Sequence, residues 1–595
     1  MNKRTKEFFD RLIIISKISI IAFVFILTAG TFFPFYEYPN DSHVYGFQTI
    51  QIANGKYEYT NDFLQNSEDW QFVPGGLVKT QYNTAIPNIL PLFPLLASGI
   101  YKLFGNIGLF YFNPILTLVF LIIIERTTTK IFNKYIGLLV LIFISVNEMT
   151  FWVGRGFLTS IIFSMFFILG VYFLNKFLKY KSNNFIIYSS VFFTLSCFIR
   201  PNGIIFVPIE LTIILSWYFY EDFVQRKLKN ISKIDCLIKR CKTLCFTITP
   251  WLVFVMFMIF FNTYYFGNPT TTFYNIPDSP EKFTSEIDSN GLLINYDRFE
   301  KYAGHFMPYP LNRVAASLNY GEVTADQQFN EIMGILGNYE ILSHLGMIIF
   351  ILISIGLVIS LKNKEYARIL IIYTIFMLSM IIFYSFNFIA DGRQGSPRDM
   401  LPVYPIFFTI ISFIIYSTLT IKNYPKKTWI RFIPRTFKIG TISFLIIFIP
   451  VSFLISDFSS TLKDSEFSFN DPFSLSDEFN DFDKTLPQDS IIVTFFEFDR
   501  VIFSEYIPFT PLGWDNKDFD PNDEIFQKTI NKLKTLLEKD NQEIFVYKKT
   551  NLQHEKDFQK YITQNENFKL IDYSRDFCKL ILDYNNKIKN DDKCY

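Results

Sequence analysis

The sequence predicts a mainly α-helical protein: a polytopic bundle of about eleven membrane-spanning helices with a small C-terminal α/β domain outside the membrane. Half of the 595 residues are hydrophobic and 19% are charged, whereas a soluble domain carries about 25% charged residues. The apolar residues lie in long runs of roughly membrane-spanning length. The formal net charge of +1 excludes a strongly basic nucleic-acid binder and an acidic disordered chain.

The first apolar run, 12–34, follows a basic N-terminal segment. A secretory signal has an apolar core of about 7–15 residues and ends in a small-residue cleavage site. This run is longer, and it ends in the bulky sequence Phe32-Phe33-Pro34-Phe35. We therefore expect a retained anchor with its N-terminus in the cytoplasm.

Ten further apolar runs follow, and Lys and Arg collect in alternate gaps between them, as the positive-inside rule predicts for a multi-pass protein of the cell membrane. The pattern places the C-terminus outside. Three prolines argue against a separate span at 87–104, so we expect an interfacial or re-entrant helix that leads into the second span. If it crossed, every later side would reverse. The ten runs are 107–125, 135–150, 157–176, 185–200, 203–220, 244–266, 344–361, 367–389, 401–421 and 438–456.

The charge and hydropathy pattern also predicts three parts. Residues 1–456 form the transmembrane domain, with large outer loops at 35–88 and 267–343. Residues 457–485 form a linker, and 486–595 form the outer soluble domain, because strand-like and helix-like segments alternate there. The expected strands are 490–496, 543–547, 568–573 and 579–583, and the expected helices are 523–540 and 557–565.

The six cysteines suggest no metal site. Cys236, Cys241 and Cys245 fit no common zinc spacing. Cys578 and Cys594 are both predicted outside, where disulfides persist. A bridge between them and two free thiols are both compatible with the sequence, because Cys594 is one residue from the end.

The segment after the first span holds the candidate chemistry. Asp41 lies a few residues beyond the hydrocarbon edge, where a carboxylate can accept a proton from an incoming hydroxyl. His43 and Tyr45 could share its hydrogen-bond network, and residues 44–54 are expected to be helical. The structural alternative is that Asn40, Asp41 or Ser42 caps this helix.

Four short motifs resemble the GT-C superfamily of polytopic glycosyltransferases, in particular the protein O-mannosyltransferase, aminoarabinose-transferase and RgtA-like group. Together they cover most of the membrane part, and their order along the chain is the stronger signal. They are Asp41–Tyr45 with Ala53–Gly55, Leu90–Pro94 with Leu103–Gly105, Phe198–Gly203, and Pro397–Pro405.

The resemblance implies an inverting transfer of a sugar from a polyprenyl or dolichyl phosphate donor to a hydroxyl acceptor on a lipid, a glycan or a protein. Asp41 would be the general base. Arg200, Arg393 and Arg398 would bind the leaving phosphate, because the guanidinium fork pairs with phosphate oxygens. Arg155 is instead expected to reach the headgroups at the interface.

The first-loop motif departs from its relatives in one respect: Ser42 stands where many of them carry a second acidic residue. A second carboxylate would come from Glu37, Glu58 or Glu148. His43 with Glu37 could hold a divalent ion, but we expect neither a metal nor another cofactor. The expected partners are the lipid-linked donor and membrane lipids, with no nucleic acid. The alternatives are a secondary transporter and a non-catalytic envelope-assembly protein.

Overall fold

The structure of the 595-residue chain is a computed structural model. The residues that it describes are 3–30, 41–58, 77–82, 84–87, 89–226, 233–269, 364–385, 401–420, 486–487, 490–493, 507–509, 524–538, 543–547, 568–573 and 577–582.

The chain divides into two compact units, each described by itself. The first unit joins Met1–Phe32, Asn113–Phe260 and Pro280–Asn470, and the second joins Phe33–Phe112, Phe261–Ser279 and Asp471–Tyr595. The predicted domain boundaries at 456 and 486 stay predictions.

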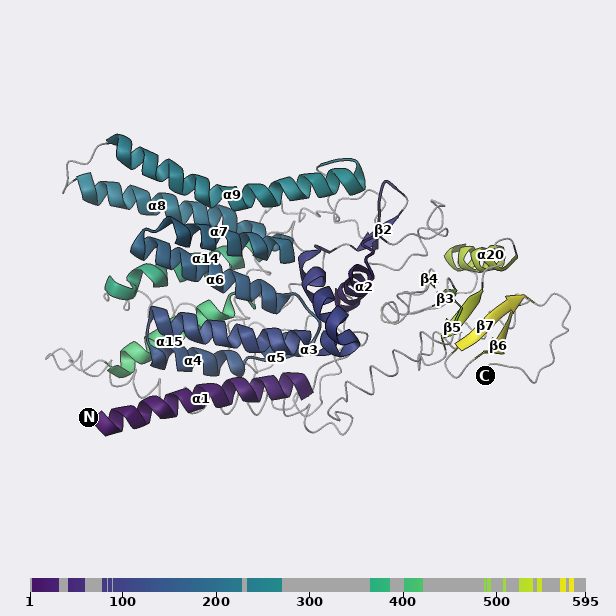
Figure 1. The fold of residues 1–595 in the computed structure, drawn as a ribbon, viewed down its shortest axis with the longest axis horizontal. Coiled ribbons are helices and arrows are strands. Elements are labelled where there is room, and N and C mark those ends of the chain that lie inside the picture. Colours follow the sequence, from purple (N-terminus) through teal and green to yellow (C-terminus); the bar gives the residue numbers. More distant parts are fainter. Residues whose placement is uncertain are drawn as a thin grey trace, which may run out of the picture. The chain divides into compact units, whose positions relative to one another are not determined.

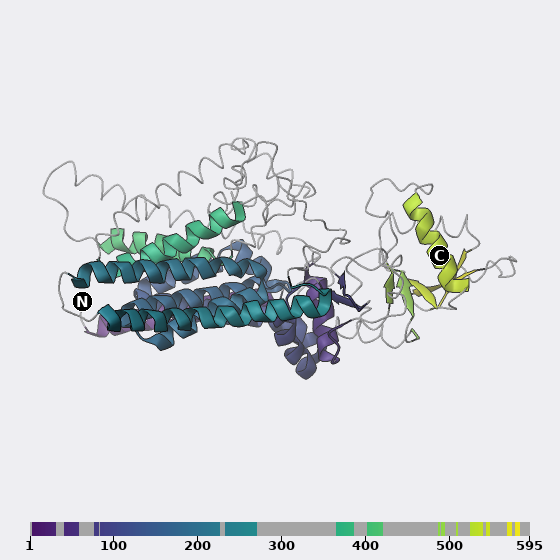
Figure 2. The ribbon, with the colours of Figure 1, turned by 90° about the horizontal axis from the view of Figure 1, so that it is seen from above.

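The first unit is a bundle of helices that lie side by side in both views (Figures 1 and 2). Five helices of the described chain are long and apolar enough to cross a membrane, and four more are apolar but shorter. The protein therefore has the helices of an integral membrane protein. The helices that lie wholly or partly in this unit are α1 (Lys3–Gly30), α3 (Leu92–Ile131), α4 (Lys134–Ser145), α5 (Glu148–Arg155), α6 (Ser160–Tyr180), α7 (Asn183–Ile199), α8 (Phe206–Arg226), α9 (Lys233–Phe266), α14 (Lys364–Ser385) and α15 (Tyr404–Thr420).

Most predicted spans within the described residues coincide with one helix each, but the predicted span 135–150 is wrong in its second half. Helix α4 ends at Ser145, and a separate helix, α5, begins at Glu148. The side chain of Asn147 accepts a hydrogen bond from the backbone N–H of Thr150 at 3.2 Å, as an N-cap residue does. The runs 344–361 and 438–456 lie outside the described residues, so the number of spans stays a prediction.

The proline-rich segment before the second span is helical from Leu92 and runs into the rest of α3. Gly105 interrupts the helix with φ 60° and ψ −148°. Only glycine adopts this conformation without steric strain. A short helical leg that leads into the second span is thus as predicted, and whether that leg crosses the membrane stays untested.

Phenylalanine fills the centre of the bundle. Phe167 of α6 stacks on Phe206 of α8 with ring centroids 4.6 Å apart, and Phe376 of α14 meets Phe167 edge-on at 5.4 Å. All three side chains are fully buried. Such aromatic pairs contribute about 0.5–1.5 kcal/mol beyond their buried area, so part of the phenylalanine content is core packing.

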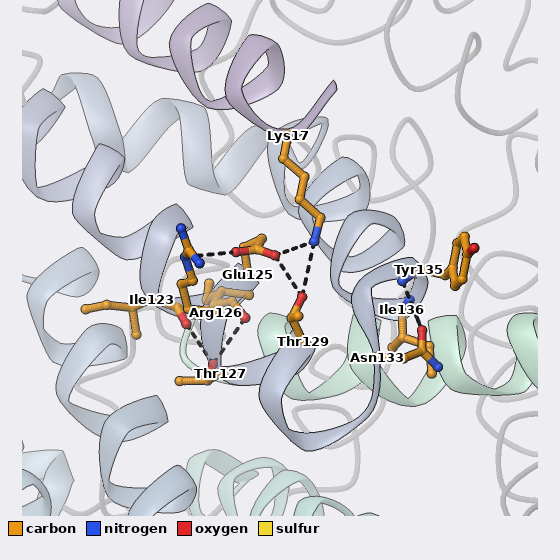
Figure 3. Close-up of polar contacts among 10 residues, drawn as sticks. Lys17, Ile123, Glu125, Arg126, Thr127, Thr129, Asn133, Tyr135 and Ile136 are labelled. Carbon is orange, nitrogen blue, oxygen red and sulfur yellow. Dashed lines mark hydrogen bonds and ion pairs between the residues drawn. The ribbon is translucent and has the colours of Figure 1, made fainter. Parts of the chain in front are cut away.

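A polar cluster joins α1 to α3 inside the bundle (Figure 3). Lys17 forms an ion pair with Glu125, and its Nζ also donates to Thr129 Oγ1 at 3.2 Å. Thr129 donates in turn to Glu125 Oε1 at 2.7 Å. The Lys17 and Glu125 side chains are 12% and 9% exposed, so water screens this pair little.

In the second unit, a small hairpin closes the end of α9. Strands β1 (Leu77–Lys79) and β2 (Ala85–Pro87) pair antiparallel, with Val78 opposite Ile86. In the turn, the backbone N–H of Gln81 donates to the Tyr265 carbonyl at 2.8 Å, and its side-chain amide donates to the Tyr264 carbonyl at 2.6 Å. The hairpin therefore satisfies carbonyls that the end of a helix leaves without partners.

The C-terminal part of the second unit contains a five-stranded sheet with the strand order β4-β3-β5-β7-β6. Strand β3 pairs parallel to both β4 and β5, whereas β7 pairs antiparallel to β5 and β6. Helix α20 buries Ile530, Leu533 and Leu536 along one face, the spacing of an amphipathic helix. The elements are β3 (Ile491–Val493), β4 (Ile507–Phe509), α20 (Glu524–Glu538), β5 (Ile544–Tyr547), β6 (Phe568–Asp572) and β7 (Phe577–Leu582).

The strands predicted at 490–496, 543–547, 568–573 and 579–583 and the helix predicted at 523–540 each coincide with one of these elements. The sequence did not predict β4. The helix predicted at 557–565 lies outside the described residues. Cys578 of β7 is disulfide-bonded, whereas Cys197, Cys241 and Cys245 are free.

Candidate functional site

Helix α2 (Asp41–Ala53) carries the predicted base at its first residue. An acidic residue in the first turn interacts favourably with the positive end of the helix dipole. The helix therefore begins three residues earlier than predicted, and Asp41 belongs to it. For Asp41 and His43, the structure describes the course of the backbone.

The helical conformation of α2 places only one of the two predicted partners of Asp41 on the same helix face as Asp41. Residues two apart do not share a helix face, whereas residues four and seven apart do. His43 therefore lies on a different face from Asp41, and Tyr45 lies on the same one. Tyr45 is buried, and its ring meets the Phe93 ring edge-on at 5.2 Å.

Two buried polar side chains lie next to each other, Gln48 of α2 and Tyr57 four residues after its end. Gln48 has no exposed surface, and neither its amide oxygen nor its amide nitrogen has a hydrogen-bond partner within the described chain. The buried hydroxyl of Tyr57 also lacks one. The Gln48 amide lies close enough to lower the pKa of Tyr57, but burial outweighs it and raises that pKa above its ordinary value. Each unpaired group destabilises the fold by about 1–3 kcal/mol.

A carboxylate follows directly in the sequence. Glu58 Oε2 accepts a hydrogen bond from Thr84 Oγ1 at 3.0 Å. Thr84 Oγ1 is also 2.7 Å from Thr80 Oγ1, across the turn of the hairpin. A carboxylate offers about four lone pairs, so Glu58 retains acceptor capacity beyond this bond.

Aromatic rings enclose Tyr57 from the end of α9. The Tyr57 ring lies 5.8 Å from the Tyr265 ring and 6.2 Å from the Phe261 ring. Tyr264 pairs with Tyr82 of the hairpin at 5.4 Å, and both of these rings are about half exposed. Aromatic walls with a few fixed polar groups are the usual lining of a small-molecule site.

The first unit holds a separate cationic group at the beginning of α6. Arg200 is the C-cap residue of α7, and its Nη1 donates a hydrogen bond to Ser160 Oγ at 3.4 Å. Thr159, the N-cap residue of α6, makes no side-chain capping bond. A helix N-terminus and a guanidinium both favour an anion.

Arg155 differs from its prediction. We expected it in an outer loop with its side chain at the headgroups, but it is the last residue of α5 and is 4% exposed. Its guanidinium lies 5.0 Å from the Phe151 ring centroid. Asn113 fixes the backbone around it by donating to the carbonyls of Val153 at 3.2 Å and Leu158 at 2.8 Å.

The remaining predicted residues lie outside what the structure describes. They are Arg393, Arg398, Glu37 and the side chain of Glu148. Within the described residues, no three His, Cys, Asp or Glu side chains come together in a way that could hold a metal ion.

The sequence analysis did not single out Gln48, Tyr57 or Thr84. The spacing of Gln48 from Asp41, seven residues, is a signal that could have found it, because this spacing returns to the same helix face. The contacts of Tyr57 with α9 could not be found from the sequence, because they join residues about 200 positions apart.

No protein-family model matches the chain, and no curated protein matches it. Among solved structures, ArnT from Cupriavidus metallidurans bound to undecaprenyl phosphate is similar, with 8% identity, a TM-score of 0.49, and coverage of 95% of this chain and 97% of that one. The Archaeoglobus fulgidus oligosaccharyltransferase in its apo form is similar with 12% identity, a TM-score of 0.48, and coverage of 89% and 69%. At these scores they assign no residue of this chain.

Proposed function

We propose that the protein is a membrane glycosyltransferase that moves a sugar from a polyprenyl or dolichyl phosphate to a hydroxyl acceptor, with inversion. The observation that carries the proposal is the position of Asp41. It begins the buried helix α2, and only residues 31–40 separate it from the end of the first membrane-length helix at Gly30. A carboxylate that follows the first span after so few residues suits a donor whose lipid chain stays in the bilayer.

The proposed chemistry gives Asp41 one task. The acceptor oxygen attacks the anomeric carbon and forms the new C–O bond while its proton passes to the Asp41 carboxylate. The bond from the anomeric carbon to the phosphate oxygen breaks at the same time. The electron pair of that bond leaves with the lipid phosphate.

The leaving phosphate gains negative charge and needs nearby cations. The group at the beginning of α6, with Arg200 on Ser160, supports this role in the first unit. Arg393 and Arg398 are further candidates from the sequence. The burial of Arg155 also supports a role in binding the phosphate, because an arginine inside a membrane bundle is costly and usually functional.

We propose a cytoplasmic N-terminus and an outer C-terminal domain.

The test is sugar transfer by purified full-length protein in detergent. Undecaprenyl-phosphate-linked sugars are offered with a cell-envelope lipid extract as the source of acceptors. Because a general base contributes about 100- to 10,000-fold, Asp41→Asn is expected to lower kcat by at least 100-fold. Asp41→Glu keeps a carboxylate and is expected to retain more activity than Asp41→Asn.

Asp10→Asn is the matched control, because Asp10 pairs with Lys134 at the beginning of α4 and has no part in the proposed chemistry. Equal turnover by wild type and a folded Asp41→Asn would remove Asp41 from the mechanism. Folding of each variant is checked by gel filtration and thermal unfolding. A protein that transfers no sugar from any donor would favour a non-catalytic role in envelope assembly.

One observation favours the alternative of secondary transport. Glu210 of α8 has no exposed surface and accepts hydrogen bonds from Ser189 and Ser190 of α7, at 2.7 and 3.1 Å. Buried carboxyl groups in spans often mark ion or proton pathways. Movement of a sugar lipid or a proton across liposomes without bond cleavage, and its loss in Glu210→Gln, would support the transporter.

A further inference from the structure

The Gln48 side chain is buried without using its hydrogen-bonding capacity. Within the described chain, it is the one buried amide side chain whose oxygen and nitrogen both lack partners. An amide carries two donors and an acceptor, and native proteins seldom bury such a group unpaired. A leucine would fit the same apolar surroundings at lower cost, so the amide calls for a ligand.

The neighbouring groups indicate what kind of ligand this is. The Tyr57 hydroxyl, which faces the Gln48 amide without a hydrogen bond of good geometry, can both donate and accept. Because burial raises its pKa, the phenol stays protonated and keeps its donor at neutral pH. The Glu58 carboxylate, bonded to Thr84 Oγ1 at 3.0 Å, offers acceptors only. An amide, a phenol and a carboxylate together match a molecule that carries several hydroxyl groups.

The rings around Tyr57 support the same ligand class. Phe261 and Tyr265 lie 6.2 and 5.8 Å from the Tyr57 ring and 4.7 Å from each other. Aromatic rings beside polar groups suit a sugar ring, which has C–H groups on its faces and hydroxyls at its edge. A free phosphate or a metal ion would not use such rings.

We propose that Gln48 and Tyr57 bind the hydroxyl groups of a sugar ring, with Glu58 at the edge of the same site. The proposal rests on the proposed function and deepens it. Gln48 stands seven residues after Asp41, on the same face of α2 and about 10 Å along its axis. A sugar held by Gln48 therefore lies along the helix face that carries the proposed base.

The sugar belongs either to the donor or to the acceptor, and two measurements distinguish these sources. The first compares binding of undecaprenyl phosphate with binding of undecaprenyl phosphate mannose and glucose, using purified full-length protein in detergent. The second measures KM for donor and for acceptor extract in the transfer assay. The variants are Gln48→Leu and Tyr57→Phe, which remove hydrogen-bonding groups and nearly keep the shape.

If the site holds the donor sugar, wild type prefers a sugar-bearing lipid over the bare lipid phosphate, and each variant lowers that preference by about tenfold. Binding of bare undecaprenyl phosphate stays unchanged. If the site holds the acceptor, donor binding is unchanged and KM for the extract rises by about tenfold. Asn54→Leu, which changes an exposed amide just after the same helix and six residues beyond Gln48, is the matched control and is expected to change neither quantity.

A stability measurement separates binding from a structural role. Gln48→Leu removes a buried amide without partners, so its unfolding temperature is expected to equal or exceed that of wild type. A lower unfolding temperature, together with unchanged sugar preference and unchanged KM values, would overturn the site while leaving the proposed function in place. Loss of transfer in Asp41→Asn with no effect of Gln48→Leu would do the same. Absence of binding and transfer in wild type would overturn both.

Discussion

The indole nitrogen of Trp251 in α9 donates a hydrogen bond to Glu210 Oε2 of α8 at 3.2 Å. The other carboxyl oxygen accepts from Ser189 and Ser190 of α7, and Ser189 Oγ lies 3.1 Å from the Gly170 carbonyl of α6. Helices α6, α7, α8 and α9 are therefore joined through one buried acid. No Lys or Arg of the described chain pairs with it.

Replacing Glu210 is expected to separate the effects of shape and of hydrogen bonding. Glu210→Gln keeps an acceptor for Ser189 and Ser190 and loses the bond from Trp251, so it should destabilise by about 1 kcal/mol. Glu210→Ala leaves Ser190 and Trp251 unpaired, leaves Ser189 with only the Gly170 carbonyl, and opens a cavity, which should cost about 3 kcal/mol or more. Thermal unfolding in detergent measures both, with Trp251→Phe as the control for the single lost bond. Equal losses in the Gln and Ala variants would contradict this account.

The Lys17–Glu125 pair predicts non-additive mutations. Glu125→Leu alone leaves the buried Lys17 without its ion pair, and Lys17→Met alone leaves Glu125 with only Arg126, whose Nε lies 3.6 Å away on a mostly exposed side chain. Each change should destabilise by about 3–5 kcal/mol. The double variant Lys17→Met with Glu125→Leu should lie within about 1–2 kcal/mol of wild type, because neither charge remains. A double-mutant cycle on unfolding free energies tests this. Additive losses would show that the pair contributes nothing as a pair.

Gly137 of α4 allows close approach to α3. A Cβ atom at this position would lie 2.2 Å from Thr129 Oγ1 and 3.3 Å from the Glu125 carbonyl oxygen. Gly137→Ala is therefore expected to destabilise by about 1–3 kcal/mol, although alanine is the better helix former. Gly99→Ala in α3 is the control, since nothing lies within 4 Å of its added Cβ. It should be neutral or stabilising by up to about 1 kcal/mol.

The bonded state of Cys578 predicts a labelling pattern. After denaturation without reductant, a thiol reagent should modify Cys197, Cys241 and Cys245 and leave Cys578 unmodified. Addition of reductant should release Cys578 and its partner, which mass spectrometry of the peptides identifies. Because disulfides persist in oxidising compartments, this pattern would also support an outer C-terminal domain. Labelling of Cys578 without reductant would contradict both statements.

The helices of the bundle could be predicted because apolar run length alone determines them. The division of the run 135–150 into α4 and α5 could not be predicted as readily, because it depends on one capping residue, Asn147. Burial of Arg155 was missed for a related reason. A charged residue between two glycines normally predicts a loop, and the contacts of Asn113 that fix the backbone here come from 40 residues away or more.

The candidate site divides in the same way. Asp41 and Tyr45 could be found because the motif and the helix period are local in sequence. Gln48 reads locally as an ordinary polar residue of an apolar helix, and its unpaired state emerges only when Tyr57 and α9 are placed beside it. Strand β4 was missed because Ile507-Pro508-Phe509 is short, and proline normally argues against a paired strand.

The contact between Gln81 and the end of α9 has a consequence for how the protein is made. The hairpin leaves the ribosome long before α9, since Gln81 and Thr263 are 182 residues apart, and N-terminal segments fold first during synthesis. Helix α9 therefore completes its insertion after the hairpin that contacts its end has been synthesised. Until α9 has been synthesised, the hairpin must stay accessible to it and must not aggregate.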